Sequence, residues 1–233
     1  SLILKALGAE VEAHIPDRIE GYGVNVPRLE RAAAEGVKVV ITIDNGIAAI
    51  DEARRCKELG LDLIVCDHHT MREELPEAVA LIHPRLAGST YANPNLCGAG
   101  VAFKLGWAIA ASRGGGRPAP PIRELLLHCL SLVALGTVAD VVPLVGENRV
   151  IVRFGLKALT VKPPPGLGEL LRLGRVEGEV DATTVAFRIA PRINAAGRMG
   201  RAGRAFDLLT TQEPREARAV AADLDRDNKR RRD

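Results

Sequence analysis

The chain has 233 residues, of which 47% are hydrophobic and only 3% aromatic, with 32 Lys and Arg against 29 Asp and Glu. This composition excludes collagen-like, low-complexity and disordered chains, and the length allows one large domain or two small ones. A net charge of +3 is too small to indicate nucleic-acid binding by itself. The longest nearly uncharged apolar run, 129–145, is shorter than the about 20 residues of a membrane span and contains Asp140, so we expect a cytoplasmic protein without a membrane partner.

Helix-like and strand-like segments alternate over residues 1–84. The patterns predict, in chain order, a helix over 2–7, a strand over 11–15, a helix over 27–35, a strand over 37–43, a helix over 47–59, a strand over 61–66 and a short strand over 79–82. The strands 37–43 and 61–66 are apolar enough to be buried on both faces of a parallel sheet. This alternation predicts an α/β fold with a doubly wound parallel sheet. Because no strand precedes the helix over 2–7, we expect the first strand of the sheet to lie before Ser1.

The pattern becomes helical from residue 98 onward. We expect helices over 98–112, 122–138, 147–159, 167–173, 202–209 and 213 to about 230, with loops rich in Gly and Pro at 114–121 and 163–166. The sheet part is therefore 1–84, the mainly helical part is 98–210, and 211–233 is expected to begin a linker helix to a further domain. The four cysteines form no CxxC pair and are expected to be small buried hydrophobic residues.

Acids and histidines follow two of the predicted strands directly. Asp44 comes after the strand 37–43, and the triplet Asp67, His68 and His69 comes after the strand 61–66. Parallel strands place their carboxyl ends at one edge of a sheet, and neighbouring strands lie about 4.8 Å apart, which brings Asp44 and His68 within reach of one metal ion. Asp-Asn-Gly alone is also a good turn or helix cap. The triplet is harder to explain in that way, because it offers a metal ligand, a donor to phosphate and an acceptor that fixes a ring tautomer.

Asp140 lies in the long apolar run 135–144. A carboxylate buried there needs a partner, and a cation is the natural one, although backbone amides at a helix end are an alternative. The isolated histidines His14, His83 and His128 are expected to be structural.

Residues 188–204 contain five arginines and no acid. Within this stretch, small residues beside Arg192, Asn194 and Arg198 would let guanidinium and backbone groups close on phosphate oxygens. A solvated basic loop is the alternative, but the interleaved Ile189 and Ile193 argue against it. With so few aromatic residues, we expect a polyanion to be held through its phosphates rather than on a base-stacking platform.

Four motifs occur in an order that resembles the DHH phosphoesterase superfamily. They are ITIDNG around Asp44, the Asp67-His68-His69 triplet, GTVADVVPL around Asp140, and RINAAGRMG at 192–200. IPDRIEGYG at 15–23 and LDRDNKRRR at 224–232 resemble one branch of that superfamily, the single-strand-specific 5′ to 3′ exonucleases. The resemblance implies that residues 1–210 form a DHH phosphoesterase domain acting on single-stranded DNA in repair and recombination.

The resemblance also implies residue roles and a cofactor. It implies two Mn²⁺ or Mg²⁺ ions in the intact enzyme, with Asp44 bridging them and with His68 and Asp140 completing the ligands of one ion. His69 would face the scissile phosphate and Asp67 would support the histidines. The substrate phosphates would be contacted by Arg18, Arg192, Asn194 and Arg198. A single-strand binding protein and a helicase are expected partners.

The sequence departs from this superfamily at both ends. The first motif, Asp-x-Asp followed by Gly-x-Thr, and the C-terminal domain are both missing from residues 1–233. We therefore expect this chain on its own to be weakly active or inactive. Two alternatives stay open: a phosphodiesterase acting on nanoRNA or cyclic dinucleotides, and a metal-free relative that binds DNA as a replication scaffold.

Overall fold

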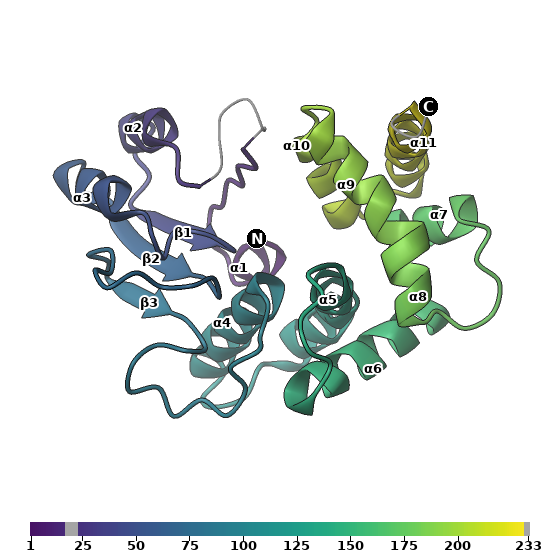
Figure 1. Cartoon of the computed structure of the whole chain (residues 1–233), viewed down its shortest axis with the longest axis horizontal. Coiled ribbons are helices and arrows are strands. Elements are labelled where there is room, and N and C mark those ends of the chain that lie inside the picture. Colours follow the sequence, from purple (N-terminus) through teal and green to yellow (C-terminus); the bar gives the residue numbers. More distant parts are fainter. Residues whose placement is uncertain (17–22, 231–233) are drawn as a thin grey trace. The chain divides into compact units, whose positions relative to one another are not determined.

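The computed structural model describes residues 1–16 and 23–230, and the chain divides into two compact units (Figure 1). The sheet unit comprises Glu20–Leu105. The helical unit comprises Ser1–Ile19 together with Gly106–Asp233. The long helix α4 (Gly98–Arg113) begins in the sheet unit and ends in the helical unit. The boundary between the two units thus falls inside a helix, whereas the sequence places it between residues 84 and 98, and the first residues of the chain group with the helical unit.

The sheet unit is built on three parallel strands in the order β1-β2-β3. Its elements are α2 (Val26–Ala34), β1 (Val39–Ile43), α3 (Ile50–Glu58), β2 (Asp62–Cys66) and β3 (Ala80–Ile82). The register aligns Val39 with Asp62 and Ile43 with Cys66, so β1 and β2 end level with each other. Helices α2 and α3 lie beside each other next to the sheet (Figure 1). The prediction of a mixed α/β fold with a parallel sheet is confirmed.

The core of the sheet unit joins this pair of helices to β2. Its buried residues include Leu29, Ile47, Cys56, Leu63 and Val65. Helix α2 begins with Asn25, whose side chain accepts a hydrogen bond from the amide of Arg28 at 3.0 Å. This cap satisfies an amide that would otherwise lack a partner in the first helical turn.

Two strand predictions need correction. Residues 11–15 form no strand: they belong to the helical unit, and Ala13 and Ile15 are exposed. A segment of alternating polarity forms a strand only where a neighbouring strand supplies hydrogen bonds. The described sheet does not include this segment. Strand β1 is also less buried than predicted, with Val39 47% and Ile43 43% exposed. Among the described strands it pairs only with β2, so it forms an edge of the described sheet.

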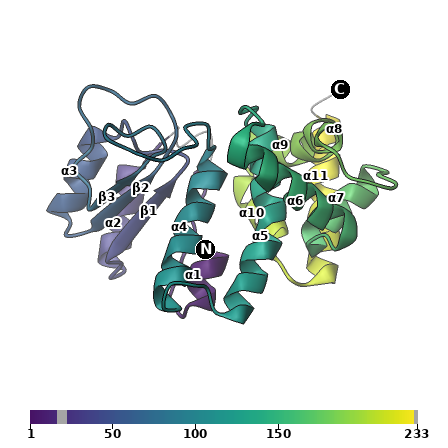
Figure 2. The ribbon, with the colours of Figure 1, turned by 90° about the horizontal axis from the view of Figure 1, so that it is seen from below.

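The helical unit packs its helices around one apolar core. Besides the end of α4, it contains α1 (Leu2–Ala6), α5 (Pro120–Ala139), α6 (Gly146–Val161), α7 (Pro165–Leu173), α8 (Ala182–Thr184), η2 (Val185–Ile189), α9 (Ala190–Arg198), α10 (Ala202–Thr210) and α11 (Pro214–Arg230). Figure 2 shows α5 to α11 gathered together. Leu167, Leu170, Ile189, Leu208 and Leu224 are fully buried in their core.

Residues 182–198 form one helix that the sequence analysis did not predict. The middle part, η2, is a π-helix, and α9 continues from it. Pro191 stands at the first turn of α9 and has no N–H to donate to the carbonyl of residue 187. The wider π turn accommodates that missing bond, which explains why a proline in the sequence concealed a continuous helix.

Helix α11 packs into the core of the helical unit, in contact with α7, α9 and α10. It buries Ala217, Val220, Ala221 and Leu224. A linker role for 211–233 stays a prediction, but this helix also completes the unit that precedes it.

Among the described residues, α5 alone is long and apolar enough to span a membrane by length and composition. Its Leu126, Val133 and Leu135 are buried in the protein, and core helices pass the same test. The four cysteines are free and buried, as predicted.

Candidate metal centre

Asp44 occupies an unusual backbone position at the end of β1. Its amide donates a hydrogen bond to the carbonyl of Cys66 at 2.9 Å, so the ladder between β1 and β2 continues to this residue. Its φ of 64° lies in the left-handed region, which is uncommon outside glycine. Strained positions of this kind gather at functional sites. The backbone thus turns sharply just where the Asp44 carboxylate is presented, and that side chain remains 55% exposed.

Asp67 is the buried anchor of the site, with only 1% of its surface exposed. Its Oδ2 accepts a hydrogen bond from the amide of Ile47 at 2.9 Å. Its Oδ1 accepts hydrogen bonds from the amides of His68 (2.7 Å) and His69 (3.2 Å), and it lies 2.7 Å from Nδ1 of His69. Burial by itself raises the pKa of Asp67, but the hydrogen bonds from Ile47, His69 and His68 outweigh it and lower the pKa. An ionised Asp67 keeps the proton of His69 on Nδ1 and leaves Nε2 as the free ligand atom.

The two histidines and Asp44 offer their ligand atoms to one point. Nε2 of His68 lies 3.0 Å from Oδ1 of Asp44. One ligand atom from each of Asp44, His68 and His69 lies within 4.8 Å of the other two. Two imidazoles and a carboxylate form a donor set suited to first-row divalent metals, so the residues present fit a metal ion.

Two glycines leave room for this arrangement. A Cβ atom on Gly98, the first residue of α4, would lie 2.2 Å from Oδ1 of Asp44. A Cβ atom on Gly46 would lie 2.6 Å from Oγ1 of Thr42, and the φ of Gly46 is +103°. Any side chain at either position would push directly on the turn that carries Asp44.

His83 supports the site, a role that the sequence analysis missed. Its side chain is buried, and its Nε2 lies 2.9 Å from the carbonyl of His69, while its Nδ1 accepts a hydrogen bond from the amide of Arg85 at 3.1 Å. The guanidinium of Arg85 donates to the carbonyl of His68. His83 directly follows β3, and this third position at the carboxyl edge of the sheet was the sequence signal that could have revealed it.

Asp140 belongs to the helical unit, where it ends α5. Its amide donates to the carbonyl of Gly136 at 2.9 Å, and Val141 next to it has a φ of +57°. Its membership of the metal site stays a prediction.

The predicted phosphate contacts have different surroundings in the structure. Arg18 lies outside the described residues. Nε of Arg192 donates to Oδ1 of Asp225 at 2.8 Å, and its other two nitrogens donate to the carbonyls of Arg188 and Leu173. This favours a structural role for Arg192.

Acids of α11 also face other arginines of the 188–204 stretch. Arg204 lies 2.9 Å from Asp223, and Arg201 lies 3.7 Å from Asp227. The local positive charge seen in the sequence is thus largely opposed by acids of α11 further along the chain. Asn194 and Arg198 are exposed on α9.

A model of the DHH family, N-terminal domain, matches residues 1–137. The chain belongs to the DHH family. This confirms the resemblance on which the metal-ligand assignments were based, and it places Asp44 and the His68-His69 pair inside the matched DHH region.

Named relatives of this DHH chain are single-stranded-DNA-specific exonucleases called RecJ. The RecJ of Bacillus subtilis (strain 168) is 44% identical over 230 residues, which cover 98% of this chain and 28% of that protein. The RecJ of Thermus thermophilus is 42% identical over 229 residues, covering 98% of this chain and 32% of that protein. The chain therefore spans about a third of the length of these relatives.

Solved RecJ structures share the fold of this DHH chain. A crystal structure of exonuclease RecJ bound to manganese matches with a TM-score of 0.87 and 41% identity, covering 99% of this chain and 57% of that one. A crystal structure of the Thermus thermophilus RecJ in complex with Mn²⁺ matches with a TM-score of 0.83 and 38% identity, covering 99% of this chain and 32% of that one.

Proposed function

We propose that this chain carries the catalytic residues of a metal-dependent exonuclease that degrades single-stranded DNA from the 5′ end. The observation that supports this most directly is the convergence of Asp44, His68 and His69, with Asp67 fixing the tautomer of His69. The related RecJ proteins are specific for single-stranded DNA, and solved RecJ structures are in complex with manganese or magnesium, which supports this substrate class and metal.

The residues have distinct roles in this proposal. Asp44 and His68 hold the metal, with Asp140 as a further ligand. His69 presents its Nε2 toward the scissile phosphate, and Asp67 orients that ring and keeps its proton on the far nitrogen. Bound divalent ions would activate water and stabilise the leaving oxygen.

The substrate is held by phosphate contacts from Arg18, Asn194 and Arg198. Arg192, whose nitrogens are occupied within the helical unit, contributes by holding α9 in place rather than by direct contact. A cytoplasmic role in DNA repair and recombination, with a single-strand binding protein and a helicase as partners, completes the proposal.

Degradation assays on the full-length protein test this function. A 5′-phosphorylated single strand is supplied with Mn²⁺, alongside the same strand blocked at its 5′ end, the same strand blocked at its 3′ end, and a duplex. We expect degradation of the free strand and of the 3′-blocked strand only. Asp44→Asn should abolish it, whereas Asp51→Asn, an exposed acid of the same unit paired with Arg54, should not.

The alternatives give different results. Rapid hydrolysis of a dinucleotide that long single strands do not inhibit would indicate a small-molecule phosphodiesterase. DNA binding without any metal-dependent turnover would indicate a scaffold. Either result would refute the exonuclease proposal.

A further inference from the structure

Phe187 is an exposed aromatic residue that neither the metal centre nor the core uses. Its side chain is 71% exposed, although it sits in the π-helix η2 between the fully buried Val185 and Ile189. Its exposed ring is therefore available for a contact outside the core of the helical unit.

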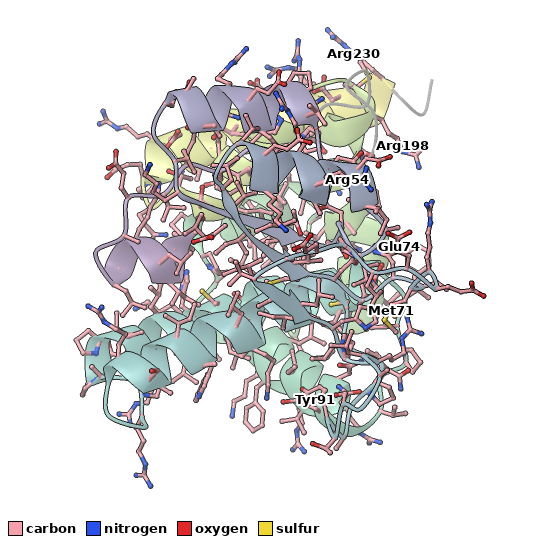
Figure 3. The ribbon with its side chains drawn as sticks, turned by 90° about the vertical axis from the view of Figure 1, so that its left-hand side faces the viewer. Arg54, Met71, Glu74, Tyr91, Arg198 and Arg230 are labelled. Carbon is pink, nitrogen blue, oxygen red and sulfur yellow. The ribbon has the colours of Figure 1, made fainter. Side chains whose placement is uncertain are left out.

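Phe187 shares one side of its helix with Asn194 and Arg198. These residues are spaced by seven and four positions along the continuous helix 182–198, and all three are exposed. Such spacings bring residues to the same side of a helix. The side chains of Asn194 and Arg198 make no hydrogen bond or ion pair with other described residues. Figure 3 labels Arg198, whose side chain points away from the ribbon.

The other side of the same helix is held firmly. Arg192 is bonded to Asp225 of α11 and to the carbonyl of Leu173 at the end of α7. Nη1 of Arg188 donates to the carbonyls of Gly174 and Arg175 at 3.3 and 3.0 Å. Because these bonds fix the rotation of the helix, the exposed side is presented in one orientation.

We propose that Phe187, Asn194 and Arg198 form a contact surface for a short stretch of the single strand, with a base stacked on Phe187 and a phosphate held by Arg198. This inference rests on the proposed function and adds a base contact to it. An exposed aromatic ring on the same helix side as an unpaired guanidinium and an amide is a combination that binds single strands without sequence preference. The positive charge of Arg198 complements the phosphate, whereas a purely apolar partner would leave both polar side chains without hydrogen bonds.

This surface revises the expectation drawn from composition. Few aromatic residues exclude a broad stacking platform but leave room for one stacking residue, and Phe187 lies next to the stretch that was expected to hold phosphates.

Binding of two probes to the full-length protein tests the proposal. The probes are a 5′-phosphorylated oligothymidylate and a strand of the same length with abasic residues, and fluorescence anisotropy is measured in EDTA so that no turnover occurs. Phe187→Ala should weaken oligothymidylate binding about tenfold and leave abasic binding unchanged, because only a base can stack. Phe187→Trp should retain the affinity. Arg198→Ala should weaken binding of both probes.

The matched control is Phe154→Ala, which removes another Phe of the helical unit that is 55% exposed on α6. It should change neither affinity. The proposal is overturned if Phe187→Ala binds oligothymidylate like the wild type, if it weakens both probes equally, or if Phe154→Ala gives the same loss. Absence of strand degradation in Mn²⁺ would refute the proposed function as well, whereas strand degradation with unaltered Phe187→Ala binding would refute this inference alone.

Discussion

Gly98 lies directly against the side chain of Asp44: a Cβ atom there would be 2.2 Å from Oδ1 and 2.5 Å from both Cβ and Cγ of Asp44. These distances are far below any real contact between such atoms. Helix α4 therefore begins at a glycine because the carboxylate of the metal centre occupies the space of a side chain.

Gly98→Ala should therefore lower manganese affinity. The added methyl group has to displace Asp44, whose backbone is already in a strained region, so we expect a loss of about tenfold, as for other residues that orient ligands. Isothermal titration of the full-length protein with Mn²⁺ measures it. Gly100→Ala is the control: its Cβ would meet only the flexible end of Leu96, and its affinity should stay near that of the wild type. Equal manganese affinities for both variants would show that metal binding does not depend on the space that Gly98 leaves for Asp44.

Asp67→Asn should weaken metal binding although Asp67 is not a ligand. The amide can no longer accept hydrogen bonds on both sides, so it loses either the bond from Ile47 or the bonds from His68 and His69, and the metal ligand His68 is held less firmly. We expect manganese affinity to fall about 10- to 100-fold. Asp62→Asn, at the exposed start of the same strand, should have no effect on the same titration. A normal affinity in Asp67→Asn would mean that the metal ligand His68 is held in place in another way.

Arg192 and Arg198 should separate into structural and substrate-binding residues. Arg192→Ala leaves Asp225 without one of its two cationic partners in a setting where that carboxylate is only 8% exposed. We expect a loss of about 3 kcal/mol in the free energy of unfolding, because breaking a buried ion pair leaves an uncompensated charge. Arg198→Ala should unfold like the wild type. Urea denaturation measures the free energy of unfolding of both variants. Equal values for Arg192→Ala and Arg198→Ala would contradict the structural role of Arg192.

The stability of the helical unit should depend on pH through Asp225. Burial raises the pKa of Asp225, but Lys229 and Arg192 outweigh it and lower the pKa below its ordinary value. A depressed pKa contributes stability above the unfolded value of about 3.9, and that contribution is lost as the pH falls through the folded value.

Asp225→Asn should therefore be less stable than the wild type at neutral pH, and the difference should shrink as the pH falls below about 4. Urea denaturation over a pH series detects this convergence. Glu177→Gln, an exposed acid of the same unit, should show no such trend. A difference that stays constant with pH would exclude Asp225 as the titrating group.

The sheet and the approach of Asp44 to His68 were predictable because their signals are local. Apolar strands ending in Asp44 and in the Asp67 triplet imply, by parallel pairing alone, a shared edge. The helix over 182–198 was not predictable in the same way, because Pro191 normally interrupts a helix and only the π turn accommodates it. The pairing of Arg192 with Asp225 was also hidden, since it joins residues that are 33 positions apart.

The supporting residues illustrate the same distinction. His83 looked like an isolated structural histidine, and its bond to the carbonyl of His69 depends on the position of β3 in the sheet. Gly98 could not be identified from the sequence, because its importance is that it has no side chain where the carboxylate of Asp44 lies.

Titration of the full-length protein with Mn²⁺, compared with its Asp44→Ala and His68→Ala variants, tests the metal centre most directly. Both variants should bind manganese at least about tenfold more weakly while keeping the wild-type unfolding curve, because each removes one of the converging ligand atoms. Asp51→Ala, an exposed acid on α3, should bind like the wild type. Unchanged manganese affinity in both variants would contradict the assignment of this site.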